Sequence, residues 1–592
     1  MTTVTETEIK IPELNCLACK NFEEPCGGKG PICDQCERYN MICAYTVGDE
    51  TILASHYHIL VREDKKVLAK ARQNVRGRPF GDYDHQIDLP VARETPWLKT
   101  PVVSTSALVA QICESCEYNQ FRDSTQPLSV DRSAKQKDSL MQHQLNTDRP
   151  PPYIHLPPKE RAQDMIASVH TLLGPYYCLI HKEELMGFMP LLYNDLFQQR
   201  GQNPILYPTY LVALALALEF TGTAEDEPND TSAAYFGTAM ALLPDMHTLS
   251  TDFARGARLL ALIGVYFQAT DRFDSAIYYI RHALKLARSI PAITTKSKTN
   301  RDRRCQRLLS TLYCLDLTVA PQVGLFVAGT GKDFDPGIPD ERAGSEDEAG
   351  LYYLCRMCRF ASAAIKLAEL GKWDDTSLFT GQGKMVVQTV SLEIAALSVS
   401  LENEIGASRR LANIMRRVQL LGCWCLSALA RPGLLSLLKS ELQRVKNGLE
   451  AVDIWGGMSD ERKYLLQYAM NGASEAFRAA TALHGNGQLG LMPFDAENCF
   501  TAGLTDTLLS TIFPSLIKDT NEHYGDYAAG SLFFMKHRAN AVAGRRERAL
   551  RLIRNLIEHR FGNLNVRAAD PKLQLELYSY FSNQSLYVRP QS

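Results

Sequence analysis

The sequence predicts a mainly α protein with a small cysteine-rich N-terminal module, a linker and a large all-α domain. Three observations support this fold class. Apolar residues recur at helical spacing along most of residues 154–592, strand-like alternation is scarce there, and residues 1–48 combine closely spaced cysteines with almost no apolar periodicity. A chain of 592 residues is also long enough for several domains.

The composition is that of a soluble globular protein, with 45% hydrophobic and 22% charged residues. The formal net charge of −2 gives no global sign of nucleic-acid binding, so a basic surface would have to be local.

No secretory signal is expected, because Met1 to Lys10 lacks an apolar run. Apolar stretches such as Leu211–Leu218 and Leu259–Phe267 are too short to span a bilayer. We therefore expect an intracellular protein with no membrane partner.

Residues 1–48 form the first predicted unit, and their cysteines are spaced C-x2-C-x6-C-x6-C-x2-C-x6-C. The six are Cys16, Cys19, Cys26, Cys33, Cys36 and Cys43. In a reducing compartment such a cluster indicates a metal site instead of disulfides. Each C-x2-C pair can place two sulfurs on one tetrahedral zinc ion. The segment also has too few apolar residues to build a core, so it needs a metal to fold.

The ligand count predicts two zinc ions. Two tetrahedral zinc ions need eight ligand positions. Six sulfurs fill eight positions only if two of them bridge both metals. Since the half C-x2-C-x6-C occurs twice, we expect one bridging sulfur from each half.

Residues 16–45, CLACKNFEEPCGGKGPICDQCERYNMICAY, resemble the fungal zinc binuclear cluster. Pro31, two residues before Cys33, and Tyr45, after the last cysteine, match residues common at these positions in that family. The resemblance implies that Cys16 and Cys33 are the bridging ligands. It also implies a nuclear transcription factor that reads short CGG-like triplets in the major groove of double-stranded DNA, often as a dimer.

The loop between the second and third cysteines departs from that family, which usually has Arg and Lys there. Lys20 is its single basic residue, and Phe22, Glu23 and Glu24 follow. The formal charge of six thiolates and two zinc ions is −2. Between the first and last cysteine there are three basic and four acidic side chains, which bring the formal charge of the module to −3. DNA affinity comes largely from cations that neutralise phosphates, so such a module should bind DNA weakly. A carboxylate such as Glu23 can nevertheless accept a hydrogen bond from cytosine.

Residues 49–153 are predicted to form a basic helix and a partly disordered linker. The helix is expected from about Thr51 to Val75, and the polar run from Ser124 to Thr147 leads to a proline triplet. Basic residues exceed acidic ones in the helix, which could grip phosphates, act as a nuclear import signal or be a solvated face. The candidate DNA-contacting residues of the module and this helix are Lys20, Lys29, Arg38, Lys65, Lys66, Lys70 and Arg72.

Dimer formation has weak support in the sequence. Leu53, Leu60 and Val67 are seven residues apart, as in a coiled coil, but the positions that should complete the seam are polar.

In the same linker, Cys113 and Cys116 form a lone C-x2-C pair. They are interpreted as incidental cysteines in preference to a third metal site.

Residues 154–345 and 346–592 are predicted to be all-α. A helical hairpin is expected, with a first helix from Ala254 to Ala269, a turn, and a second helix that Asp274 and Ser275 cap and Pro291 ends. No steady 34-residue period indicates a tetratricopeptide array. Further helices are expected near 205–221, 302–326, 351–370, 384–403, 406–446, 459–484, 500–519 and 530–561.

A second resemblance, to the middle homology region of the same class of regulators, covers residues 154–345. The stretches that support it are 156–185, 233–244, 259–290 and 303–324. Residues 346–592 carry no motif of their own and are interpreted as a helical continuation of this regulatory domain. The basic run from Arg545 to Arg560 is interpreted as a solvated surface.

The sequence therefore predicts a zinc-dependent, DNA-binding transcription regulator in the nucleus, and not an enzyme, because no catalytic motif is found. It would control genes of RNA polymerase II, in a metabolic or secondary-metabolite pathway. The alternative is a co-regulator or repressor that does not bind DNA and acts through protein contacts, since Glu23 and Glu24 make the loop acidic. In either case a homodimer or a partner transcription factor is a possible binding partner.

Overall fold

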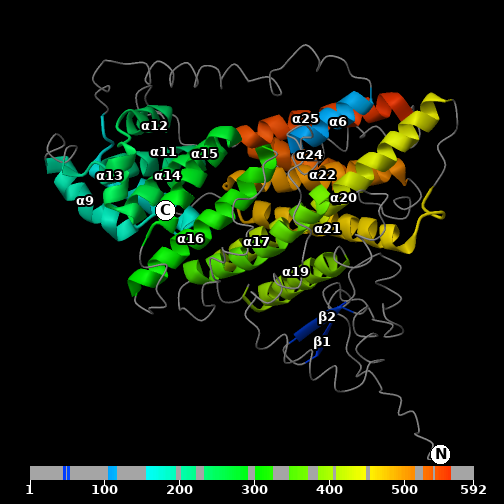
Figure 1. The fold of residues 1–592 in the computed structure, drawn as a ribbon, viewed down its shortest axis with the longest axis horizontal. Coiled ribbons are helices and arrows are strands. Elements are labelled where there is room, and N and C mark those ends of the chain that lie inside the picture. Colours follow the sequence, from blue (N-terminus) through cyan, green and yellow to red (C-terminus); the bar gives the residue numbers. More distant parts are fainter. Residues whose placement is uncertain are drawn as a thin grey trace, which may run out of the picture.

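The computed structural model shows a mainly α protein, as the sequence predicts (Figure 1). The helices form one elongated body. The helices between residues 159 and 251 lie at one end of it, and those after residue 409, together with the helix at residues 105–115, lie at the other. The residues that the structure describes are 44–47, 50–53, 105–116, 155–194, 202–221, 232–290, 300–323, 346–370, 384–404, 409–447, 454–513, 524–537 and 540–561.

A two-stranded antiparallel hairpin precedes the helical body in the sequence. It consists of β1 (Ala44–Val47) and β2 (Glu50–Leu53), with Val47 paired to Glu50. Gly48-Asp49, which separates the strands, is a pair typical of two-residue hairpin loops. The prediction of a helix that begins at Thr51 is therefore wrong at its start, because local turn residues and β-branched Thr51 and Ile52 favour a strand. The rest of that predicted helix lies outside the described residues.

The first part of the body is built around α11 (Leu206–Thr221), which is buried over nearly its whole length. Such an all-round apolar helix is stable only when other helices surround it. Here α8 (Lys159–Leu173), α12 (Ser232–Ala241) and α14 (Phe253–Ala269) pack against it. Two further helices, α9 (Lys182–Asn194) and α13 (Met246–Thr251), lie at this end of the body (Figure 1).

The predicted hairpin is confirmed as α14 followed by α15 (Phe273–Arg288). The two helices pack closely, since a Cβ on Gly264 would lie 2.7 Å from the Ile280 side chain. Asp271 in the turn has a φ of 63°, a left-handed conformation that Asp tolerates better than most residues. The predicted cap is wrong: Arg272 occupies the N-cap without a side-chain bond, and Asp274 lies in the first turn.

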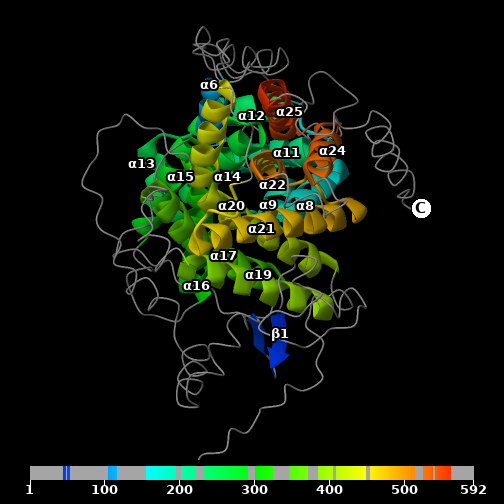
Figure 2. The same ribbon diagram turned by 90° about the vertical axis from the view of Figure 1, so that its right-hand side faces the viewer.

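The middle of the body consists of α16 (Asn300–Val319), the short 3-10 helix η3 (Ala320–Val323), α17 (Glu346–Leu370) and α19 (Lys384–Glu404). These agree with the helices predicted near 302–326, 351–370 and 384–403. Helix α17 packs against both α16 and α19. Strand β2 lies beside α19, which places the hairpin under the body in Figure 2.

Helix α20 (Arg409–Lys446) is the central element of the second part, and α17, α19, α21 and α22 all pack against it. By length and composition it is apolar enough to cross a membrane. However, 83% of its most apolar window is buried among the other helices. Packing inside the body therefore accounts for its apolar sequence.

The remaining helices are α21 (Asp460–Gly485), α22 (Pro493–Ile512), α24 (Tyr524–His537) and α25 (Ala541–Phe561). Two predictions need correction here. The helix expected at 500–519 begins at Pro493, since proline suits the first turn of a helix. The helix expected at 530–561 is two helices, with Asn540 between them, where its side chain caps α25 through the amide of Ala543.

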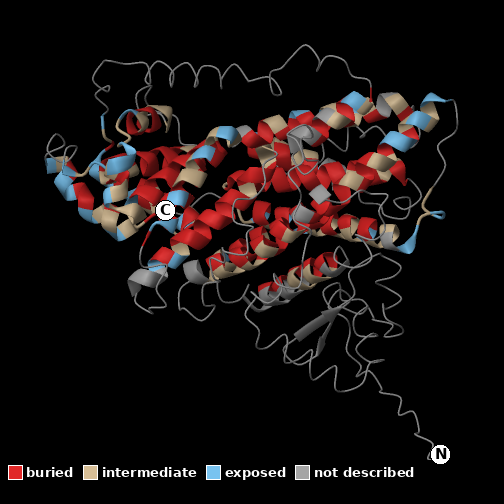
Figure 3. Cartoon of the chain, viewed as in Figure 1, coloured by how far each residue is buried: buried red, intermediate tan, exposed pale blue. Residues whose placement is uncertain are grey.

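One helix in the predicted linker was not anticipated. Residues Thr105–Ser115 form α6, which packs against α20 and α25 with Leu108 and Ile112 fully buried. Its core positions belong to the same continuous hydrophobic cluster as those of the other helices. Figure 3 shows this buried core running the length of the body. The predicted segments 154–345 and 346–592 therefore share a core.

Candidate functional site

The predicted zinc ligands and DNA-contacting residues lie outside the described residues. This holds for all six cysteines from Cys16 to Cys43 and for Lys20, Lys29, Arg38, Lys65, Lys66, Lys70 and Arg72. The nearest described element is β1, which begins directly after Cys43.

The donor set of that module suits zinc. Cysteine thiolates are among the ligands that structural zinc sites use, and six of them in a segment with little core match a structural role for the metal. When bound, zinc would supply folding energy to the segment and no reaction chemistry. Within the described ranges, no group of three or more His, Cys, Asp or Glu side chains is placed to hold a metal ion.

The cysteines of the helical body pack as core residues. Cys113 of α6 and Cys116, directly after that helix, are buried. Burial, followed by the neighbouring Cys116, raises the pKa of the Cys113 thiol to about 11. In the middle of the body the sulfur of Cys314 lies 3.6 Å from that of Cys355. Burial holds the pKa of the Cys314 thiol well above its usual range. Thiols in this state are poor metal ligands, because the thiolate is the ligand form.

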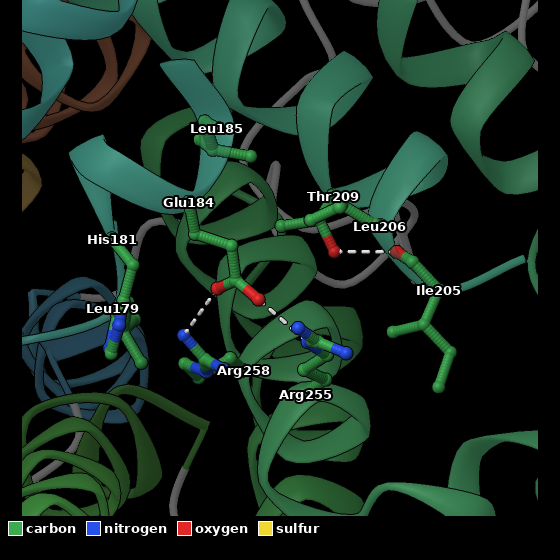
Figure 4. Close-up of a pocket in the computed structure, with 9 residues that line it drawn as sticks. All are labelled: Leu179, His181, Glu184, Leu185, Ile205, Leu206, Thr209, Arg255 and Arg258. Carbon is green, nitrogen blue, oxygen red and sulfur yellow. Dashed lines mark hydrogen bonds and ion pairs between the residues drawn. The ribbon is translucent and has the colours of Figure 1, made fainter. Parts of the chain in front are cut away.

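A hollow opens where α9, α11 and α14 meet (Figure 4). Its enclosed space has room for about one water molecule, and the remainder is open to solvent. Its apolar lining residues are Leu179, Leu185, Ile205 and Leu206, and its polar lining residues are His181, Glu184, Thr209, Arg255 and Arg258. Helices α9 and α11 both begin at this hollow, so their positive ends lie beside the two arginines.

Glu184 bridges the two arginines of the hollow. Its carboxylate lies 2.6 Å from Nε of Arg255 and 3.1 Å from Nη1 of Arg258. Burial tends to raise the pKa of Glu184, but the two guanidinium groups outweigh it and hold that pKa below its usual value. The arginines differ in access to solvent, since 48% of the Arg255 side chain is exposed and only 14% of that of Arg258.

His181 lies at the same hollow and is uncharged at neutral pH. Burial, reinforced by the positive charge of Arg258, lowers the pKa of its imidazole from 6.5 to about 4. The charged lining side chains are thus two arginines and one glutamate. Asp252 also pairs with Arg255 at 3.5 Å, so the two arginines are balanced by two carboxylates.

Two networks of buried charges join the halves of the body. In the first, Arg417 of α20 pairs with Asp495 of α22 at 3.1 Å and donates to the hydroxyl of Tyr176 at 3.0 Å. Arg417 also donates to the carbonyl of Gln488. Asp495 in turn accepts from the amide of Gly490, which fixes the loop before α22. Since Tyr176 follows α8, this network ties residues before 200 to residues after 400.

The second network links the hairpin turn to α25. Arg545 forms an ion pair with Asp271 in the turn between α14 and α15. Next to it, Arg546 pairs with Glu497 of α22 at 2.7 Å. Buried Arg431 of α20 donates to Thr501 at 2.7 Å in the same region. The turn between α14 and α15 is therefore held by a charged side chain that lies more than 200 residues further along the sequence.

These contacts change the interpretation of α25. The sequence analysis assigned its basic run to a solvated surface, but Arg545 and Arg546 point into the body, and Arg560 donates to the carbonyl of Cys116 at 2.9 Å. Only part of the helix, including Arg548 and Arg551, is exposed. The prediction of a solvated surface was wrong for these arginines because a charged side chain can be buried when it is paired and hydrogen-bonded.

Comparison with known proteins gave no match: no family model, no curated protein and no solved structure is similar to this chain. The functional assignment therefore depends on the residues of the chain itself.

Proposed function

We propose that this chain is a zinc-dependent transcription regulator. It binds two zinc ions and double-stranded DNA through the module around Cys16–Cys43 and acts in the nucleus on genes of RNA polymerase II. The observation that carries the proposal is the spacing C-x2-C-x6-C, present twice in a segment with little core. Two pairs that are each followed six residues later by a third cysteine give a complete ligand set for two tetrahedral metals.

Two further features support DNA binding. Residues 62–78 hold seven basic and two acidic residues, which is a local basic footprint in a chain of net charge −2. The large helical body with its own core also suits the regulatory role that the resemblance to a middle homology region implies. No enzymatic step is part of the proposal.

The experiment uses the full-length chain, purified under reducing conditions. Native mass spectrometry should reveal two bound zinc ions. Fluorescence anisotropy should then detect binding to a duplex with CGG triplets that weakens as salt increases, because released counterions favour the complex. Cys16→Ser should reduce both signals, whereas Cys113→Ser, in buried α6, should leave them unchanged. Zinc-loaded protein without salt-sensitive DNA binding would refute the DNA-binding part.

A second candidate function is a co-regulator or repressor that acts through protein contacts. Glu23 and Glu24 favour it, because carboxylates in the loop repel phosphates. In this case the module would bind zinc but would dock on another transcription factor or on a second copy of the chain. Unaided binding of the full chain to a CGG duplex at nanomolar concentration would exclude this alternative.

A further inference from the structure

Three buried thiols meet where α16 packs against α17. The sulfur of Cys314 on α16 lies 3.6 Å from the sulfur of Cys355 on α17, although the two residues are 41 positions apart in the sequence. Cys358, one turn after Cys355, also lies within hydrogen-bonding reach of Cys314. All three residues are at most 2% exposed. Cys314 is therefore in contact with two sulfurs of the neighbouring helix.

The contact between Cys314 and Cys355 is close enough for a disulfide to form. The two sulfurs of a disulfide are about 2.05 Å apart, so these two must approach each other by roughly 1.5 Å. Packed helices shift by about 1–2 Å in ordinary conformational changes, which is enough to close this gap. Once one sulfur is oxidised, the other already lies beside it, so the second step needs no encounter through solution.

Cys314 is the thiol of the pair that ionises first. Burial holds the pKa of the Cys314 thiol well above its usual range, but a hydrogen bond with Cys355 and the positive charge of Arg359 oppose this effect. For Cys355, the hydrogen bond with Cys314, followed by burial, raises the pKa. When one proton leaves the pair, the thiolate is therefore on Cys314 and the Cys355 thiol donates to it. Arg359, one turn after Cys355 on α17, favours the thiolate form of both cysteines.

We propose that Cys314 and Cys355 are an oxidative modification site, at which hydrogen peroxide forms a disulfide that joins α16 to α17. The Cys314 thiolate attacks one oxygen of the peroxide, which gives a sulfenic acid and releases hydroxide. Cys355 then loses its proton, and its sulfur displaces hydroxide from the sulfenic sulfur. The two thiols give up two electrons and two protons in total, and the peroxide is reduced to two water molecules.

The environment of the pair sets how fast this reaction runs. Because burial keeps the thiolate scarce, the pair reacts slowly and responds to sustained oxidation. In a reducing compartment the two thiols are the resting state, and the disulfide is transient. The site belongs to the helical body, so it does not depend on whether the N-terminal module binds zinc or DNA.

The test uses the full-length chain, loaded with zinc and freed of reductant. It is incubated with hydrogen peroxide, its remaining thiols are alkylated, and it is digested without reduction. Mass spectrometry should then detect one linked peptide that contains Cys314 and Cys355 and that disappears after treatment with dithiothreitol. This readout identifies the linked residues, so oxidation of the N-terminal cysteines does not interfere with it.

Variants separate the site from general oxidation of buried thiols. Cys314→Ser should form no such crosslink, whereas Cys499→Ser, which removes a buried thiol of α22, should form it as the wild type does. Arg359→Gln should slow its formation at least about threefold, because the thiolate is the attacking form. Arg359→Lys keeps the charge and should retain most of the rate. Arg304→Gln, at an exposed position of α16, should leave the rate unchanged.

Thermal melting verifies that each variant is folded, and the wild-type experiment depends on no substitution. The proposal is overturned if the oxidised wild type contains no peptide that links Cys314 to Cys355, or if this peptide forms only in urea-unfolded chain. A crosslink between Cys314 and Cys358 as the main product would overturn the assignment to Cys355. Equal rates for Arg359→Gln and wild type would overturn the role of the Cys314 thiolate.

Discussion

The guanidinium of Arg417 lies 3.1 Å from the carboxylate of Asp495, and both side chains are buried. The two residues are on different helices, α20 and α22, and the same guanidinium reaches Tyr176 from the first part of the body. A buried ion pair contributes little net stability by itself, but removal of one partner leaves the other charge without compensation.

We therefore expect Asp495→Asn or Arg417→Met to lower the free energy of unfolding by about 3–5 kcal/mol. Urea denaturation of the full chain measures this. Arg478→Gln is the matched control, because Arg478 pairs with Glu475 on α21 at 2.7 Å, and the two side chains are 45% and 23% exposed, against 3% and 0% for Arg417 and Asp495. Exposed pairs contribute about 0–1 kcal/mol, so this variant should be almost as stable as the wild type. Equal stability of Asp495→Asn and wild type would show that the buried pair does not hold the halves together.

Gly264 should tolerate no side chain, whereas Gly187 should. A Cβ at Gly264 would lie 2.7 Å from the Ile280 side chain and 3.2 Å from the carbonyl oxygen of Ala276, so Gly264→Ala forces α14 and α15 apart. Overpacking of this kind costs about 1–3 kcal/mol. Beyond the adjacent residues and backbone of its own helix, a methyl group at Gly187 in α9 would meet no atom within 4 Å, so Gly187→Ala should stabilise the protein by about 0.5–1 kcal/mol. Thermal melting of both variants gives the signs, and opposite signs to these would contradict the packing described.

The stability of the protein should depend on pH through His181. Burial lowers the pKa of its imidazole to about 4 in the folded state, while the unfolded chain has the ordinary value near 6.5. As pH falls from about 6.5 to 4, the unfolded state gains a proton that the folded state does not, so His181 reduces the stability across this window.

The measurement is the free energy of unfolding of wild type and His181→Gln as a function of pH. We expect the two curves to diverge below about pH 6.5, with a flatter curve for the variant. Titration of the imidazole by NMR should give an apparent pKa near 4. A value near 6.5 would mean that the imidazole is hydrated and that the hollow is wetter than described.

Zinc stoichiometry should follow the predicted ligand set. Exchange of any one of the six cysteines, such as Cys26→Ser, should lower the content below two zinc ions per chain and unfold the module, because metal binding supplies its folding energy. Cys355→Ser, in the buried core, is the matched control and should keep both ions. Elemental analysis after dialysis measures this, and two retained ions in Cys26→Ser would contradict the ligand assignment.

Local sequence patterns predicted most of the helices but not how they are held together. The hairpin of α14 and α15 was predictable because its apolar spacing and its turn lie within one short stretch. The break at Asn540 was missed, since the helical spacing of apolar residues continues across it.

The contacts that join distant segments could not be predicted from a single sequence. Arg417 and Arg431 each interrupt an apolar run in α20, and this was the available signal that they need buried partners. Their partners Asp495 and Thr501 lie 78 and 70 residues further along the chain. The hollow was missed for the same reason, since His181, Arg255 and Thr209 come from three separate helices or their ends.

Helix α6 joins the start of the described helices to their end. It docks on α20 and α25, and Arg560 binds the carbonyl of Cys116, so residues 105–116 contact residues more than 400 positions further along the chain. Contacts between such distant segments must offset the entropy lost when a long loop is closed. Truncation of the chain before α25 would therefore uncover part of the apolar face of α6 that carries Leu108 and Ile112.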